Sequence, residues 1–155
     1  MRVSNADGVV IGRGCLGRPW LFKQLGEIFA GKEASQFPTL GEVAETMLAH
    51  AEAVVEWNGS QTALRTFRKH ASWYLTGFAV GKDIRREIQQ INSLDDLTSV
   101  IDNFDTELSL PPDAYRIPRS HTGGPKDVSL PDGWLENPYE DFELSELAGQ
   151  FASGG

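Results

Sequence analysis

A glycine-rich turn directly after a short apolar run most constrains what this chain can fold into. Residues 9–11 are all β-branched and show no alternation, which is typical of a parallel strand buried on both faces. Gly12, Gly14 and Gly17 follow, and Pro19 stands where the first turn of a helix accepts proline. Backbone amides at such a turn favour an anion. The pattern therefore predicts a strand, a phosphate-binding turn and a helix, although a glycine-rich β–α connection without a ligand has the same composition.

Other side chains narrow the chemistry of this region. Arg13 lies inside the turn and Arg18 at its exit, so either could contact a phosphate or lie solvated on the surface. Cys15 is the only cysteine, which excludes an internal disulfide and a cysteine-based metal site and favours a small apolar filler. The three histidines are scattered without ligand spacing, so we expect no metal.

The length and hydropathy of the chain predict one soluble domain. Its 155 residues suffice for a modest core. No apolar run approaches the roughly 20 residues of a membrane span, and the N-terminus lacks the layout of a secretion signal. We therefore expect a cytoplasmic protein with no membrane partner.

Helical periodicity dominates the middle of the chain. Apolar residues recur at three- and four-residue steps in five segments, two of which begin with capping-box sequences. The predicted helices cover 20–31, 39–57, 60–78, 83–91 and 93–108. The last four are joined by short loops, as in an antiparallel helical bundle, so the predicted fold class is mainly α.

The composition changes beyond Leu110. Six prolines are interleaved with glycine, serine and acidic residues, and no apolar period survives. We expect this acidic tail to be mostly irregular or disordered, although the apolar and aromatic residues of the stretch 134–147 could dock on the helices.

The charge is distributed unevenly. The chain carries a net charge of −8, yet residues 59–91 hold six basic residues against two acidic ones. Arg65, Arg68 and Lys69 share one face of a predicted helix, with aromatic residues interleaved. This face is either an ordinary solvated surface or a binding surface for nucleic-acid phosphates and bases.

Two segments together resemble a known family. Residues 7–22 resemble the last barrel strand and following turn of the tRNA-dihydrouridine synthases, a flavoenzyme family also labelled NifR3-like. Residues 68–75 are similar to the arginine-lysine-histidine and tryptophan-tyrosine motif of that family's helical C-terminal domain. The resemblance covers residues 5–108. It implies a TIM barrel that holds FMN and reduces a uridine of tRNA to dihydrouridine with NADPH or NADH, together with a helical domain that helps to grip tRNA.

The resemblance carries the family's sites over to particular residues. Gly12, Arg13 and Gly14 are the implied FMN phosphate site, since such sites lie at the C-terminal face after the last barrel strands. No catalytic residue carries over, because the family's catalytic cysteine belongs to the barrel and Cys15 is not its counterpart. The implied tRNA surface comprises Arg65, Arg68, Lys69 and His70, with Arg85 and Arg86 as weaker candidates.

The chain departs from the family in length. A TIM barrel needs about 250 residues, whereas this chain begins at what resembles strand eight. We therefore expect a remnant of the last barrel β–α unit (1–31), a helical tRNA-binding domain (32–110) and the acidic tail (111–155). Without the missing barrel portion of the same enzyme, residues 1–17 should be disordered, pair with another chain or pack irregularly. The isolated chain should then bind tRNA without retaining FMN or activity.

Two other interpretations stay open from the sequence. The chain could be a free-standing helical protein-interaction module whose tail engages a protein partner through residues 134–147. The acidic tail could also fold over the basic helix face and compete with RNA, since from Asp105 onward ten acidic residues stand against three basic ones.

Overall fold

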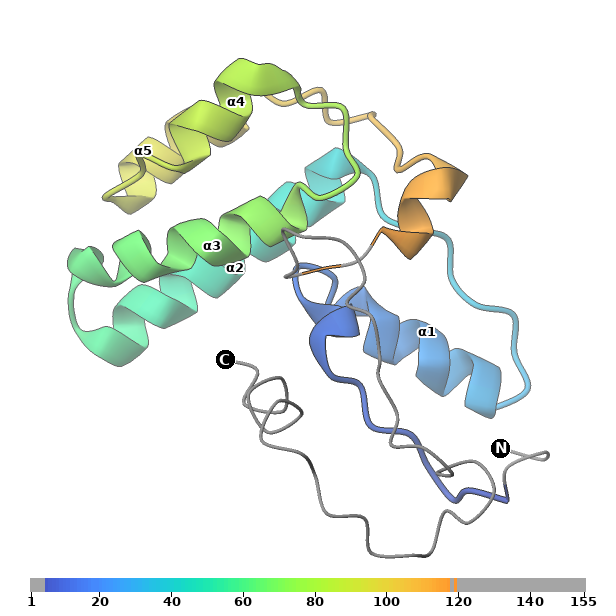
Figure 1. Cartoon of the computed structure of the whole chain (residues 1–155). Helices are drawn as coiled ribbons and strands as arrows, with labels where there is room; N and C mark the ends of the chain where they lie inside the picture. Colours follow the sequence, from blue (N-terminus) through green and yellow to red (C-terminus); the bar gives the residue numbers. More distant parts are fainter. Residues whose placement is uncertain (1–4, 118, 120–155) are drawn as a thin grey trace, which may run out of the picture. The chain divides into compact units, whose positions relative to one another are not determined.

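The computed structural model describes residues 5–117 and 119 (Figure 1). These residues belong to one compact unit, Met1–His121, so the glycine turn and the helices form one unit. Our expectations for residues 120–155, including the docking stretch 134–147, lie outside the described residues.

Helices make up the regular structure of the described part of the chain. This part has five α-helices and no strand, which confirms the mainly helical fold class. None of its helices is long and apolar enough to cross a membrane. The elements are the 3₁₀ helix η1 (Arg13–Cys15), α1 (Trp20–Phe29), α2 (Leu40–Asn58), η2 (Gln61–Ala63), α3 (Leu64–Tyr74), α4 (Gly81–Ile88), α5 (Leu94–Ile101) and η3 (Pro112–Arg116).

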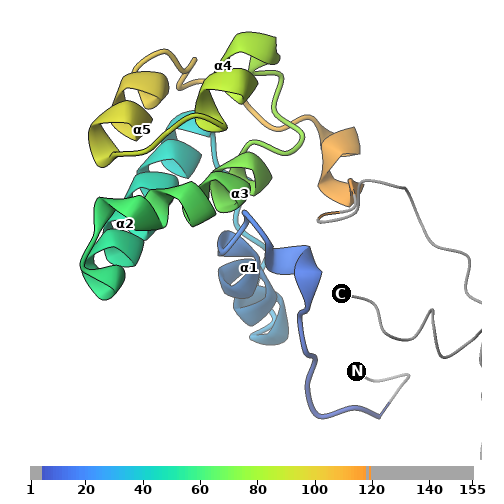
Figure 2. The same ribbon diagram turned by 60° about the vertical axis from the view of Figure 1, so that its left-hand side comes forward.

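Helices α2 and α3 lie side by side as a hairpin (Figures 1 and 2). The capping box predicted at the start of α2 is present. The Glu42 amide donates to the Thr39 hydroxyl, and the Thr39 amide donates to the Glu42 carboxylate. Gly59 ends the helix with a φ of 65°, a left-handed conformation that favours glycine. These local signals fix the length of α2 and the reversal into α3.

The core lies where α2 and α3 meet α4 and α5. Helix α3 packs against α2 and α4, and α5 packs against the same two helices. The largest fully buried side chains come from these helices and their connections: Leu40, Val43, Met47, Leu64, Phe67, Leu75, Ile88, Ile91 and Leu97.

Helices α3 and α5 are shorter than their apolar periodicity predicts. They end at Tyr74 and Ile101. Phe78 and Phe104 are nevertheless buried, because the turns after the helices place them in the core. Gly77 has a φ of 93°, which reverses the chain after α3. Apolar spacing therefore overestimates the length of a helix when the turn that follows the helix also places apolar side chains in the core.

The strand predicted at residues 9–11 does not form in the described part of the chain. Val9 is 53% exposed and Val10 is 98% exposed, within an irregular segment. A lone parallel strand would leave its backbone groups unpaired, which explains the irregular conformation. The turn then forms η1, and α1 begins at Trp20.

The chain after α5 runs back along the start of α2 and continues toward the glycine turn. The Leu40 amide donates to the Leu108 carbonyl at 2.8 Å. Residues 110–117 and Arg119, which we call the return segment, contain η3 and bury the side chains of Leu110 and Ala114. The described part of the tail that we expected to be irregular or disordered is therefore packed on the helical unit.

Candidate nucleic-acid interface

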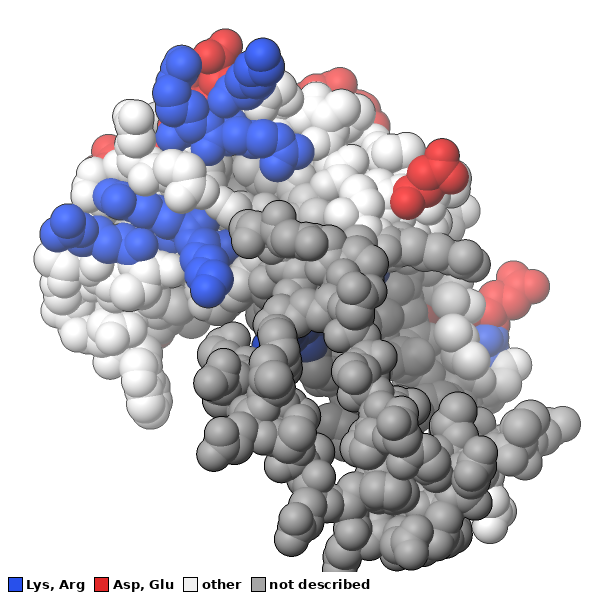
Figure 3. Space-filling model, in the orientation of Figure 1, with Lys and Arg blue, Asp and Glu red and all other residues white. Residues whose placement is uncertain are grey.

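Basic side chains of α3 and α4 gather on one face of the helical unit. Figure 3 shows two groups of Lys and Arg on this face, one over α3 and one over α4. Arg65 and Lys69 are exposed one helical turn apart on α3. Lys82, Arg85 and Arg86 are exposed on α4. The two groups together form a positively charged surface, which favours a polyanion.

Arg68, which we predicted to face RNA, binds the protein itself. Its Nε donates to the Ile91 carbonyl at 2.8 Å, and its Nη2 donates to Asn92 Oδ1 at 2.7 Å. These bonds hold the connection between α4 and α5 against α3. The structure therefore separates Arg68 from its neighbours Arg65 and Lys69, whose side chains extend into solvent.

Arg85 and Arg86 also have partners within the protein. Nη2 of Arg85 donates to the Phe78 and Leu75 carbonyls at 2.6 and 3.2 Å, and so binds the chain that follows α3. Arg86 forms an exposed ion pair with Asp83 at 2.7 Å, a kind of pair that contributes little net stability. Both residues are exposed and add positive charge to the surface. Arg65 and Lys69 on α3 are less constrained, because they do not have such hydrogen-bond or ion-pair partners among the described residues.

The structure brings together two histidines that are distant in the sequence. The rings of His50 on α2 and His70 on α3 lie 5.2 Å apart, edge to face. His50 Nδ1 shares a 3.2 Å hydrogen bond with the Tyr74 hydroxyl. The Trp73 ring lies 5.0 Å from His70 and 5.3 Å from the Lys69 ammonium. The predicted basic face therefore borders an aromatic cluster.

The histidine pair predicts a pH dependence of stability. Burial, and next the charges of His70 and Lys69, lower the pKa of His50 and His70 below the ordinary 6.5. The unfolded chain therefore takes up protons first, and the free energy of unfolding should fall as the pH drops below 6.5. Urea unfolding at about pH 7.5 and about pH 5.5 measures this fall. This decrease in the free energy of unfolding should be smaller in the double variant His50→Gln, His70→Gln. An equal decrease in that variant would show that other groups cause the pH dependence.

The glycine turn offers room and charge for a phosphate. A Cβ on Gly12 would meet no atom within 4 Å, and Arg13 is exposed. The amides of Cys15 and Leu16 donate to the carbonyls of Gly12 and Arg13 at 3.4 and 3.1 Å, which closes the turn. Gly14 has only ordinary contacts. Open space beside a backbone turn with an arginine fits a bound phosphate group.

Gly17 and Arg18 have structural roles in this turn. Gly17 has a φ of 66°, and a Cβ on it would lie 2.2 Å from the backbone carbon of Trp73. Arg18 donates from Nε to the Gly14 carbonyl at 2.5 Å and from Nη1 to the Tyr115 carbonyl at 2.9 Å. The glycine turn therefore packs on the end of α3, so the predicted phosphate site and the predicted RNA-facing helix are neighbours.

Sequence reasoning missed Arg119, which lies in the tail that we expected to be irregular. Its side chain is 6% exposed. Nη1 donates to the Leu16 carbonyl at 2.9 Å and to the Trp73 carbonyl at 2.5 Å. Leu16 is 103 positions away in the sequence, so no local pattern indicates this contact.

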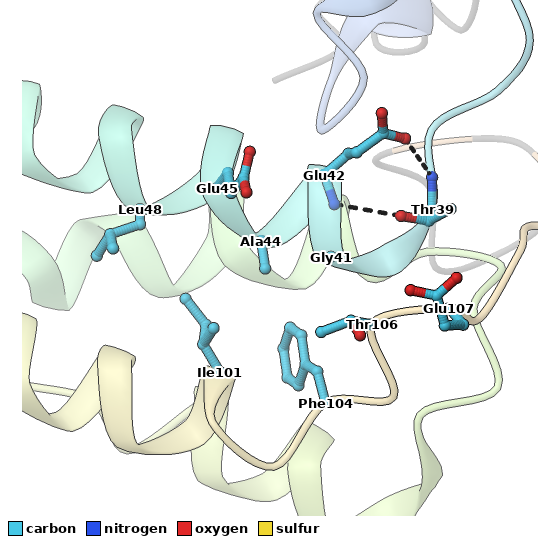
Figure 4. A pocket seen from close by; sticks show the side chains of 10 residues that line it. All are labelled: Thr39, Gly41, Glu42, Ala44, Glu45, Leu48, Ile101, Phe104, Thr106 and Glu107. Carbon is cyan, nitrogen blue, oxygen red and sulfur yellow. Dashed lines mark hydrogen bonds between the residues drawn. The ribbon is translucent and has the colours of Figure 1, made fainter.

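A groove elsewhere on the unit does not suit a phosphate. It has a volume of about 370 Å³ and lies between α2 and the chain at the end of α5 (Figure 4). Leu48, Ile101 and Phe104 give it apolar surface, and three of its lining residues, Glu42, Glu45 and Glu107, are acidic. Negative charge makes this groove a poor phosphate site. Among residues 5–117 and 119, no three potential metal ligands come together.

The part of the chain that contains the α3–α4 surface matches a known protein family. Residues 1–109 match the sequence model of the dihydrouridine synthase family. The chain belongs to the dihydrouridine synthase family. The family assignment made from the two motifs is thus confirmed, and the matched region ends just before the return segment.

Individual relatives extend the similarity over the tail. The chain is 43% identical to a probable tRNA-dihydrouridine synthase of Mycobacterium leprae, over all of this chain and 40% of that protein. A Mycobacterium tuberculosis relative with the same description is 42% identical over all of this chain and 39% of its own length. The tRNA-dihydrouridine synthase B of Xanthomonas axonopodis is 33% identical over 72% of this chain and 34% of that protein. No solved structure matches significantly.

The alignments show how much of the chain and of its relatives is similar. The chain spans about 40% of the length of the mycobacterial relatives. We expected the resemblance to cover only residues 5–108, and the family match does end at residue 109. The mycobacterial relatives align with the tail as well, so the similarity extends further than the two motifs indicated.

Proposed function

We propose that this chain is the C-terminal portion of a NifR3-like tRNA-dihydrouridine synthase and that its α3–α4 surface binds tRNA. The exposed pair Arg65 and Lys69 lies within the family-matched region and carries this proposal, and Lys69 also lies over the Trp73 ring. Cationic groups displace counterions from phosphates, and aromatic rings stack on bases. A cytoplasmic location belongs to the same proposal.

The segment before α2 supports a barrel remnant. Val10 is almost fully exposed, and α1 leaves Phe22 and Phe29 each 54% exposed. An apolar strand sequence followed by a helix with an exposed apolar face suits the last β–α unit of a TIM barrel, in which neighbouring strands and helices bury both. The exposed apolar face of α1 then packs on the barrel portion of the same enzyme. The β–α unit precedes the helical domain at residues 32–110.

In that enzyme Gly12, Arg13 and Gly14 hold the phosphate of FMN. The open space at Gly12 and the exposed position of Arg13 support this role. FMN supplies hydride transfer from NADPH or NADH to the uracil ring. Cys15 takes no part in the chemistry, since its Sγ donates to the Gly12 carbonyl at 3.2 Å within the turn. The chain contributes binding of the cofactor phosphate and of RNA.

Binding experiments test the RNA and cofactor assignments separately. We expect the chain to bind tRNA at about 20 mM salt and to lose most of its affinity at about 200 mM, because phosphate contacts depend on counterion release. Absence of binding at low salt would refute the RNA assignment. The full-length protein that carries this chain should bind FMN and form dihydrouridine in unmodified tRNA when supplied with NADPH or NADH. Absence of bound flavin would refute the cofactor assignment.

A further inference from the structure

Two arginines join the glycine turn and the return segment reciprocally. Arg18 of the turn donates from Nη1 to the Tyr115 carbonyl of the return segment at 2.9 Å. Arg119 of the return segment donates from Nη1 to the Leu16 carbonyl of the turn at 2.9 Å. Each segment thus supplies one guanidinium and one carbonyl, so neither segment can shift without breaking bonds on both sides.

Arg119 also binds the end of α3. Its Nη1 donates to the Trp73 carbonyl, and its Nη2 donates to the Thr76 carbonyl at 3.4 Å. Carbonyls at the C-terminal end of a helix carry partial negative charge and favour a cation. One buried side chain therefore connects the turn, α3 and the return segment.

The two guanidinium groups have no carboxylate partner among the described residues. Nε of Arg119 is buried and has no hydrogen-bond partner within this part of the chain. Burial, and next the charge of Arg18, lower the pKa of Arg119 to about 10, so the group stays charged at neutral pH. Within the described part of the chain, carbonyl dipoles rather than carboxylates balance these two positive charges. This leaves a positive potential beside the glycine turn, which attracts an anion.

We propose that Arg119, together with Arg18, is a positioning residue for the glycine turn. It holds the exit of the glycine turn, Leu16 and Gly17, against the end of α3 and makes the surroundings of the turn electropositive, so that the phosphate group of FMN binds at residues 12–14. This inference rests on the proposed function, which assigns residues 12–14 to that phosphate. It gives a role to the return segment, which lies beyond the family match that ends at residue 109.

The test compares FMN with riboflavin, which lacks the phosphate, in the full-length protein that carries this chain. Flavin fluorescence gives the dissociation constant of each. Arg119→Met should lower the preference for FMN over riboflavin about tenfold and leave riboflavin affinity unchanged. Arg119→Lys, which keeps the charge but replaces the planar guanidinium by a single nitrogen, should restore part of the preference. Lys32→Met removes an exposed charge in the connection after α1 and should change neither constant.

Different results would contradict the positioning role of Arg119 and the proposed function of the chain. An unchanged preference in Arg119→Met, or an equal loss of both flavins, would overturn the positioning role, because a merely structural role affects both ligands alike. If Arg119→Met does not fold, the same comparison in Arg119→Lys and Arg18→Lys decides, with a lowered FMN preference in support. A wild-type protein that binds neither flavin would refute the proposed function itself, and the inference with it.

Discussion

Gly17→Ala is expected to lower the free energy of unfolding by about 3 kcal/mol or more. Two penalties add at this position. The φ of 66° strains any residue that has a Cβ. That Cβ would also lie 2.2 Å from the backbone carbon of Trp73 and 2.4 Å from its carbonyl oxygen. Because these are main-chain atoms of α3, no side-chain rotation relieves the contacts, and the turn has to move away from the helix.

Substitutions at two other glycines separate the cost of backbone strain from the cost of the Cβ contact. Gly31 has a φ of 74° but open space around it, so Gly31→Ala measures backbone strain alone and should cost about 1 kcal/mol. Gly26 lies inside α1 with nothing within 4 Å, and Gly26→Ala should stabilise by about 0.5–1 kcal/mol. Urea unfolding followed by circular dichroism gives all three values. If Gly17→Ala costs no more than Gly31→Ala, the turn does not pack on α3 in this way.

Local sequence signals predicted the features that are decided within a few residues. The capping boxes at Thr39 and Ser93 are both present, because each closes between residues three positions apart. Helix α2 ends at Asn58, one residue beyond the predicted end, for a similar reason, since the left-handed conformation of Gly59 is a property of one residue. The number and order of the helices follow from such signals.

The geometry of the candidate site depends on contacts that periodicity does not report. Helical spacing gives the angle of a side chain around its own helix, but not which other element covers that angle. Arg65 and Arg68 were assigned to one face, yet Arg68 meets a loop 23 positions later in the chain. Arg18 finds its carbonyl 97 positions away. The glycine pattern likewise did not report that Gly17 is required by its contact with α3.

Reversing Arg65 and Lys69 together to glutamate is expected to weaken tRNA binding at low salt by at least about tenfold. The slope of log affinity against log salt should also decrease by about 1 for each residue. Arg65 has no hydrogen-bond or ion-pair partner among the described residues. Lys69 contacts the Trp73 ring, 5.3 Å from its centre, and its charge acts on His70. The helical core should therefore tolerate both changes, which unchanged circular dichroism would verify.

A matched double variant decides whether position or net charge controls the affinity. Lys23→Glu with Lys32→Glu makes the same change in net charge on exposed residues of α1 and the connection after it, and should weaken binding far less. Equal weakening would mean that tRNA responds to total charge, and the α3 surface would not be its binding site. Arg68→Glu breaks the bonds to the α4–α5 connection, so it should lower the urea midpoint. Its loss of binding would follow from the fold, which is why the test of the interface excludes it.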